Sequence, residues 1–168
     1  MIELFAKVIK AFSLDHQCQV FGQNLFKPSY ISGLGKYLVQ SDGFTPIRPD
    51  YFDTTNSELS SIGYGLGRSI ASVNSVLVIK QQDFLYLGID QLINTLNNCL
   101  GDNKPRGWFR IVCLISDLPT EGTQAYSNNT SLLYSLSKFV NTYYHYFPST
   151  FKKCLCIDEP CSINFLST

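Results

Sequence analysis

The segment of residues 53–67 holds the side chains best suited to chemistry. Glu58 stands at the start of an expected helix. Thr55-x-x-Glu58 matches a capping box, in which Thr55 caps the helix and Glu58 binds back to the cap amide. Three glycines follow in the same helix, as Gly63-x-Gly65-x-Gly67. This spacing is not a dinucleotide fingerprint, which would lie between a strand and a helix. Glycine in a helix costs about 1 kcal/mol relative to alanine, so we expect another helix or a ligand to approach closely.

Other nucleophilic and titratable groups give weaker signals. Of the six cysteines, only Cys154, Cys156 and Cys161 are clustered, and they lack the second ligand pair of a structural zinc site. We interpret them as thiols on a strand and its following loop, and predict no metal site. His16 and His145 are the two histidines, and we interpret both as surface or packing residues.

Alternating strands and helices must position these residues. Continuous apolar runs predict strands buried on both faces, and a spacing of three to four residues predicts helices. The expected strands are 19–21, 76–79, 109–115 and 154–157, with a short extended piece at 48–52. The expected helices are 2–14, 57–73, 85–100 and 131–140. This order predicts an α/β fold, a three-layer sandwich with a mostly parallel central sheet that binds ligands at the carboxyl ends of its strands.

Length and composition limit the possible functions. The 168 residues suit one domain, which we place at 1–158, with 159–168 as a C-terminal tail. The net charge is zero and there is no basic run, which argues against nucleic acid binding. No stretch is long and apolar enough to span a membrane. The N-terminal helix carries Glu3, Lys7 and Lys10, unlike a secretory signal, so we expect a cytoplasmic protein.

Several short motifs occur in a characteristic order. They are Gly22-Gln23-Asn24-Leu25, Phe52-Asp53-Thr54, Ser57-Glu58, the three glycines, Gln82-Asp83-Phe84 and Asp90-Gln91-Leu92-Ile93-Asn94. The order resembles the pyrimidine-binding domain of transketolase-like thiamine-diphosphate enzymes, most closely the beta subunits of 2-oxo acid dehydrogenases. The resemblance covers about residues 19 to 135 and implies the thiamine-diphosphate-binding fold.

The resemblance implies a role for Glu58. In the family, one Glu hydrogen-bonds a ring nitrogen of the aminopyrimidine and promotes the imino tautomer, which takes the proton from the thiazolium carbon. The resulting ylid attacks a 2-oxo acid or a ketose, and the ring then acts as an electron sink. By position Glu58 is this catalytic residue. The resemblance also places Gln82 and Phe84 at the cofactor, and Asn24 and Tyr126 in the substrate pocket.

Three positions depart from the family pattern. Gln82 stands near the place of a Phe that stacks on the pyrimidine, Tyr126 stands where a His is usual, and Gln23 replaces an acidic residue. We therefore expect a substrate pocket that differs from that of an ordinary 2-oxo acid dehydrogenase.

Half of the expected cofactor site is missing from the sequence. The family holds the diphosphate through Mg²⁺ on a second domain that begins with Gly-Asp-Gly, and this chain has only Gly101-Asp102-Asn103. We therefore expect a separate diphosphate-binding subunit that binds the Mg²⁺, in a heterodimer or heterotetramer that acts on a small molecule. The alternative is a catalytically inactive relic of the pyrimidine domain that serves as a structural or regulatory partner.

Overall fold

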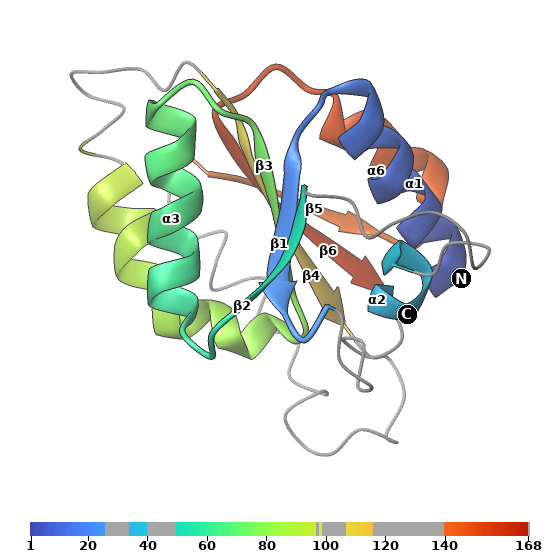
Figure 1. The fold of residues 1–168 in the computed structure, drawn as a ribbon, viewed down its shortest axis with the longest axis horizontal. Helices are drawn as coiled ribbons and strands as arrows, with labels where there is room; N and C mark the ends of the chain where they lie inside the picture. The colour runs from blue at the N-terminus through green and yellow to red at the C-terminus, as the bar shows by residue number, and fades with distance from the viewer. Residues whose placement is uncertain (26–33, 40–49, 97, 99–106, 116–139, 168) are drawn as a thin grey trace.

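Parallel strands form the centre of the molecule, and helices cover both of their faces (Figure 1). The computed structural model describes residues 1–25, 34–39, 50–96, 98, 107–115 and 140–167. The described elements are α1 (Ile2–Asp15), β1 (Gln19–Gln23), α2 (Leu34–Val39), β2 (Tyr51–Thr54), α3 (Glu58–Ile70), β3 (Ser75–Ile79), the 3₁₀ helix η1 (Gln82–Gly88), the π-helix η2 (Gln91–Thr95), β4 (Phe109–Ile115), β5 (Asn141–His145), α6 (Pro148–Leu155) and β6 (Cys161–Ser167). The six described strands pair in the order β2-β1-β3-β4-β6-β5, and every pair is parallel. The prediction of an α/β fold with a parallel central sheet between helical layers is confirmed.

One face of the sheet is covered by α1, α2 and α6. These helices contribute buried side chains that meet the valines of β3 and β4: Phe5, Ile9, Leu34, Leu38, Phe151 and Leu155. Each such apolar side chain contributes about 1.5–3 kcal/mol when it leaves water. The spacing of four residues in α1 and in α6 places these side chains on one side of each helix.

The other face is covered by α3, η1 and η2 through Ile62, Leu66, Leu85 and Leu92. An aromatic layer lies beneath α3. The ring of Phe21 stacks on that of Phe52 with centroids 5.3 Å apart, and the Tyr64 ring meets Phe21 edge-on at 5.2 Å. Such pairs add about 0.5–1.5 kcal/mol each beyond their burial, so they fix α3 over β1 and β2.

Several elements agree with the sequence. The predictions for α1, β3 and β4 are confirmed, and β1 extends two residues beyond the expected 19–21. The expected helix 85–100 is helical where the structure describes it, but as consecutive 3₁₀ and π turns. The short helix α2 was not expected. Of the expected helix 131–140, residues 131–139 lie outside the described part of the chain.

The C-terminal region differs from expectation. Residues 154–157 do not form a strand, because Cys154 and Leu155 end α6, which starts at Pro148. The segment predicted as a tail, 159–168, is mostly a strand, since Cys161–Ser167 form β6 between β4 and β5. The polar residues Ser162 and Asn164 are fully buried there, and the Asn164 side chain bonds to both Ser162 and His145. These hydrogen bonds allow a strand with polar residues to occupy the interior.

Arg110 holds α6 against the amino end of the sheet. Its side chain is buried, and its guanidinium donates to the carbonyl oxygens of Leu155 (3.2 Å), Ile157 (2.6 Å) and Glu159 (2.9 Å). Burial lowers its pKa from the usual value. The guanidinium carbon also lies 5.1 Å from the Trp108 ring centroid. A buried cation thus satisfies carbonyls at and beyond the end of α6.

No helix in the described part of the chain combines the length and apolar character needed to cross a membrane.

Candidate functional site

The order in which strands are added to the sheet changes side between the neighbouring strands β1 and β3. β1 is followed in sequence by β2 on one side, and β3 is followed by β4 on the other, although β1 and β3 are themselves neighbours (Figure 1). The helix α2 after β1 and the helix α3 before β3 lie on opposite faces of the sheet. In open α/β sheets, ligands bind beyond the carboxyl ends of the strands at such a point.

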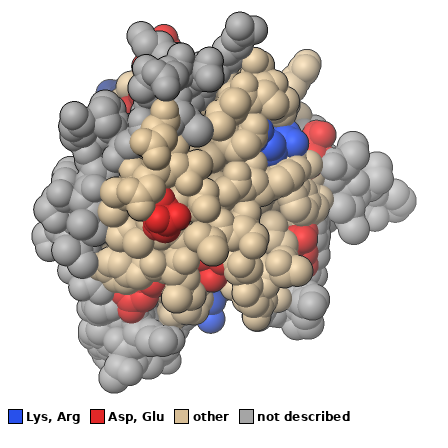
Figure 2. Space-filling view, turned by 90° about the vertical axis from the view of Figure 1, so that its left-hand side faces the viewer, with Lys and Arg blue, Asp and Glu red and all other residues tan. Residues whose placement is uncertain are grey.

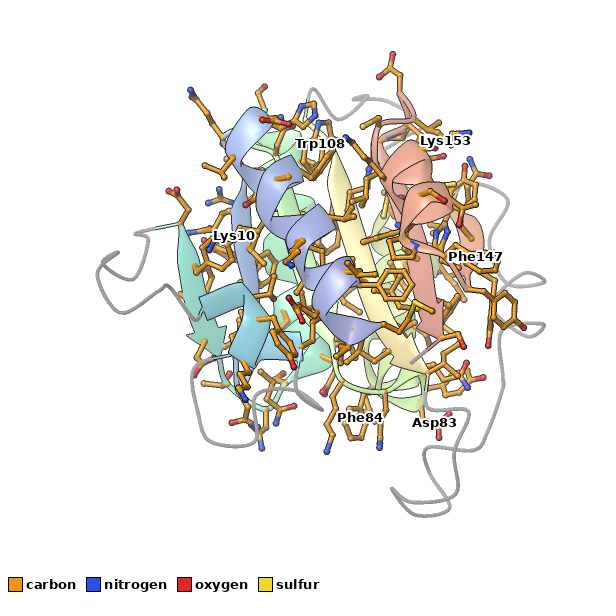
Figure 3. The ribbon with its side chains drawn as sticks, turned by 90° about the vertical axis from the view of Figure 1, so that its right-hand side faces the viewer. Lys10, Asp83, Phe84, Trp108, Phe147 and Lys153 are labelled. Carbon is orange, nitrogen blue, oxygen red and sulfur yellow. The ribbon has the colours of Figure 1, made fainter. Side chains whose placement is uncertain are left out.

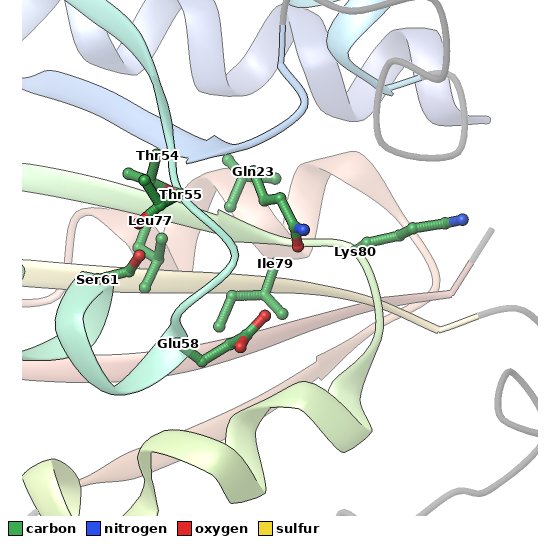
Figure 4. A pocket seen from close by; sticks show the side chains of 9 residues that line it. Gln23, Thr54, Thr55, Glu58, Ser61, Leu77, Ile79 and Lys80 are labelled. Atoms are coloured by element: carbon green, nitrogen blue, oxygen red, sulfur yellow. The ribbon is translucent and has the colours of Figure 1, made fainter.

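A shallow hollow lies at this place. About 240 Å³ of space, including open solvent, lies within its outline, so it is a surface depression and not an enclosed cavity; its wall comes from the ends of three strands and the start of α3. The lining residues are Gln23, Thr54, Thr55, Glu58, Ser61, Leu77, Val78, Ile79 and Lys80 (Figure 4). The apolar floor comes from β3, and the polar groups stand around it.

The strand register brings the polar groups together. Gln23 lies beside Thr54 in the pairing of β1 with β2, and Gly22 lies beside Val78 in the pairing with β3. A Cβ on Gly22 would collide with the Val78 carbonyl oxygen, so only glycine allows this approach. Side chains alternate along a strand, so Gln23 points to the same face as Phe21, the face that α3 covers.

Glu58 is the first residue of α3 and is partly exposed. Its carboxylate makes no hydrogen bond or ion pair with the described residues. The Glu58 carboxylate and the Gln23 amide reach toward the hollow from opposite sides (Figure 4). The start of a helix favours a negative charge by about 0.3–1 kcal/mol. Glu58 is therefore a carboxyl group available to a ligand.

The predicted capping box is wrong. The N-cap of α3 is Ser57, whose hydroxyl oxygen accepts from the Ser60 amide at 3.3 Å. Thr55 lies two residues before the cap, and its carbonyl accepts from the Ser57 amide at 2.8 Å. Glu58 follows the cap directly and does not reach back to it as the third helical residue would.

The three glycines of α3 have different surroundings. A Cβ on Gly65 would collide with the Phe109 ring, and one on Gly63 would lie 3.4 Å from the Gln91 side chain. We expected another helix or a ligand at close range; the close neighbour is instead the ring of Phe109 on β4, at Gly65, and η2 makes only ordinary contact at Gly63. Gly67 has nothing within 4 Å of its Cβ position.

The other predicted cofactor residues lie near the hollow but do not line it. Gln82 starts η1 and is 3% exposed, and Phe84 is partly buried against the core beneath α3. Figure 3 places Phe84 and Asp83 at the carboxyl end of the sheet, opposite Trp108. Asp83 and Phe84 therefore lie at the same end of the sheet as Glu58.

Of the two predicted substrate-pocket residues, the structure describes only Asn24. Asn24 directly follows β1 with a positive φ of 60°, a conformation that asparagine tolerates. It is partly buried but does not line the hollow. Tyr126 lies outside the described residues.

Sequence reasoning did not identify Thr54, Ser61 and Lys80 as lining residues. Lys80 directly follows the apolar run of β3, and Thr54 ends β2. The ends of the predicted strands could have indicated Thr54 and Lys80, because side chains at the carboxyl ends of adjacent parallel strands meet at one edge of the sheet.

The cysteines are thiols wherever the structure describes them: Cys18, Cys113, Cys154, Cys156 and Cys161. Burial raises the pKa of Cys18 and of Cys161 to about 12. Within the described ranges, no three His, Cys, Asp or Glu side chains are grouped so that they could hold a metal ion.

No protein-family model matches the chain. A search of the curated proteins also finds no match.

Proposed function

We propose that this chain is the pyrimidine-binding subunit of a two-component thiamine-diphosphate-dependent enzyme that acts on a 2-oxo acid or a ketose. The supporting observation is the position of Glu58. Its carboxylate is unpaired among the described residues and faces the hollow, which lies where the strand order changes side between β1 and β3. The order of motifs around it gives the same assignment from the sequence.

The chemistry of the lining residues supports placing one end of the cofactor in the hollow. The ring nitrogen of an aminopyrimidine needs a carboxyl group that can exchange a proton with it, and Glu58 has no competing partner within the described chain. Leu77 and Ile79 supply apolar surface beneath a ring. The bound cofactor would supply a carbanion and an electron sink, and Glu58 would hold or release one proton at the ring nitrogen.

A second subunit would complete the site. The hollow is shallow and open, and the sequence lacks the Gly-Asp-Gly motif of the family's diphosphate-binding domain. A partner carrying Mg²⁺ and the diphosphate site would close it, in a heterodimer or heterotetramer.

The molecule has a surface suited to such a partner. The face that α3 and η1 cover shows few charged side chains (Figure 2). Large apolar side chains are exposed on and beside these helices: Leu59, Tyr64, Ile70, Val73 and Leu87. Interfaces that remain assembled are depleted in charge and enriched in aromatic groups at their centres.

The second candidate is a catalytically inactive pyrimidine-domain subunit. It is favoured by Gln82, which is buried and stands near the position where the family has an aromatic ring that stacks on the pyrimidine. An inactive subunit would keep the fold and the partner surface without proton transfer at Glu58.

The test is the Glu58→Gln substitution in the assembled protein. The tagged full chain is isolated with its native partner, and proton–deuterium exchange at the thiazolium carbon of added thiamine diphosphate is measured. An amide cannot exchange a proton with the ring, so we expect exchange to fall by about 100-fold or more. Glu3→Gln is the matched control, since Glu3 also lies in the first turn of a helix.

The melting temperatures of Glu58→Gln and Glu3→Gln must lie close to that of the wild type, so that a loss of exchange cannot come from unfolding. Equal exchange in folded Glu58→Gln and wild-type complexes would leave the inactive subunit as the better assignment. A native complex that neither binds thiamine diphosphate nor catalyses the exchange would contradict the proposed enzyme.

A further inference from the structure

Gly88, the last residue of η1, lies against the first turn of α3. A Cβ at Gly88 would stand 2.5 Å from Cδ1 of Ile62, 3.1 Å from the carbonyl oxygen of Glu58 and 3.2 Å from its carbonyl carbon. A Cβ atom rarely comes so close to other atoms. The backbone of η1 can therefore approach the backbone of Glu58 to this distance because Gly88 has no side chain.

The winding of η1 brings Gly88 to this place. The buried residues of η1 are Gln82, Leu85 and Gly88, at intervals of three. A 3₁₀ helix has three residues per turn, so these residues form one row that faces the interior. An α-helix turns by about 100° per residue, and between Gln82 and Gly88 it would rotate the glycine about 120° out of this row. The 3₁₀ form of η1 is thus what places the glycine against α3.

Glu58 stands between η1 and the hollow. Its backbone carbonyl lies against Gly88, and its carboxylate lines the hollow. In Figure 4, η1 is the helix that follows Lys80, and it runs on the side of Glu58 opposite Gln23. Ile62, one turn further along α3, is fully buried, so its side chain has little room to move aside. A displacement at the contact with η1 would therefore move the Glu58 carboxylate within the hollow.

We infer that Gly88 is a positioning residue, which sets the place of the Glu58 carboxylate in the hollow through the 3₁₀ turn behind it. The inference rests on the proposed function for its effect on the reaction. A group that transfers a proton must lie within hydrogen-bond reach of its partner. A methyl group at position 88 would displace the Glu58 carbonyl by a few tenths of an ångström. Since a misplacement of about 1 Å can cost about 100-fold in rate, we expect a loss of about tenfold.

Three variants separate this role from simple packing. Gly88→Ala brings a methyl group against both Ile62 and the Glu58 carbonyl. The double variant Gly88→Ala, Ile62→Val also removes Cδ1, the Ile62 atom in the way, so it nearly conserves the buried volume while the contact with the Glu58 backbone remains. Gly63→Ala is the matched control in α3, because a Cβ there meets only the Gln91 side chain, at 3.4 Å.

Two measurements are made on the full chain. In the isotope-labelled chain without cofactor, nuclear Overhauser contacts between the side chains of Glu58 and Ile79, which both line the hollow, report where the carboxylate lies. In the complex isolated with its native partner, proton–deuterium exchange at the thiazolium carbon reports the reaction. We expect Gly88→Ala to melt at a lower temperature, to change the intensity of these contacts and to slow the exchange by about tenfold. Gly63→Ala should change neither the contacts nor the exchange.

The double variant distinguishes positioning from packing. We expect it to recover the melting temperature but to keep the changed contacts and the slow exchange, because the Glu58 carbonyl is still displaced. If Gly88 only filled the core, the double variant would restore all three. Unchanged contacts of Glu58 in Gly88→Ala, or wild-type exchange in the double variant, would overturn the inference. A wild-type complex without exchange would contradict the proposed enzyme, and the contacts measured without cofactor would still decide whether Gly88 positions Glu58.

Discussion

Ser57 fixes where α3 begins and so where the Glu58 carboxyl lies. Its hydroxyl oxygen accepts from the Ser60 amide, and its carbonyl accepts from the Ser61 amide at 2.9 Å. The backbone of Ser57 itself is extended, with φ −151° and ψ 96°, so the helix starts only at the next residue. The carboxyl group therefore leaves the helix at its first residue, beside the ends of β1 and β2.

Ser57→Ala should reduce the free energy of unfolding by about 1 kcal/mol, because the cap of α3 is lost. Thr55→Ala should leave it within about 0.5 kcal/mol, as is usual for an exposed residue without a special role. Urea denaturation of both variants measures the difference. A larger loss in Thr55→Ala would restore the capping box at Thr55.

His145, the last residue of β5, is a buried titratable residue. Its Nε2 lies 3.0 Å from the Asn164 side-chain oxygen, and its ring packs on Phe151 with centroids 5.3 Å apart. Burial lowers the pKa of His145 below the usual 6.5, and the Asn164 contact opposes this in part. The folded protein therefore favours the neutral imidazole.

The sign of the pH effect follows from this shift. The unfolded chain binds a proton at His145 as the pH falls through about 6.5, whereas the folded chain does so only at lower pH. The stabilisation is complete above 6.5 and is lost between 6.5 and the lower folded-state pKa. The slope from one group is at most about 1.4 kcal/mol per pH unit.

Urea denaturation across this pH range should show a steeper decline for the wild type than for His145→Gln. His16→Gln is the control, since His16 is exposed. Parallel pH profiles for wild type and His145→Gln would contradict the assignment, whatever their absolute stabilities.

At the scale of the element, α3 has two faces with different requirements. Gly65 faces the Phe109 ring of the central sheet, so its missing side chain sets how closely the helix approaches. Gly67 is exposed and lies on the surface that we propose for the partner. Packing thus requires glycine at position 65, whereas nothing in the described chain requires it at position 67.

Gly67→Ala should stabilise the isolated chain by up to about 1 kcal/mol, because alanine is the better helix former. Gly65→Ala should destabilise it by about 1–3 kcal/mol, because the phenyl ring must move. Thermal melting distinguishes the two, since Tm should move in opposite directions. A stabilised Gly67→Ala chain that binds its partner less well would place the interface over Gly67.

At the scale of the whole molecule, β6 connects the sheet. It pairs with β4 over seven residues and with β5 over five, and the described β5 has no other neighbour. His145 and Asn164 join the same two strands through their side chains. The integrity of this side of the sheet depends on one segment.

Deleting residues 161–168 should therefore prevent folding. Circular dichroism should show loss of the cooperative melt, and amide exchange should show loss of protection in β4, since one of its two neighbours is gone. Asn164→Ser keeps the strand, but its shorter side chain cannot reach His145. This variant should fold with reduced stability, because the hydrogen bond between β5 and β6 side chains is lost. A truncated chain that melts cooperatively with a native spectrum would show that β6 is dispensable.

The sequence predicts the layered architecture because its central strands are continuous apolar runs. Val76–Ile79 and 109–115 have no alternative to burial on both faces. β6 gives no such signal, since Ser162 and Asn164 are polar and their burial depends on a partner far along the chain. The motif around Glu58 indicates the site, but Lys80 and Thr54 come to the hollow only through strand order, which local patterns do not contain.

The position of β6 also has a consequence for how the protein is made. The ribosome delivers β1 to β4 first, and these four strands are paired with one another in the finished sheet. β5 emerges next without its described neighbour, because β4 pairs with β6 and not with β5. Until residue 167 leaves the exit tunnel, the nascent chain carries the open edges of β4 and β5, which expose backbone groups to any other strand. A pause in translation between β5 and β6 would prolong this state, and it is there that the nascent protein would most need a chaperone.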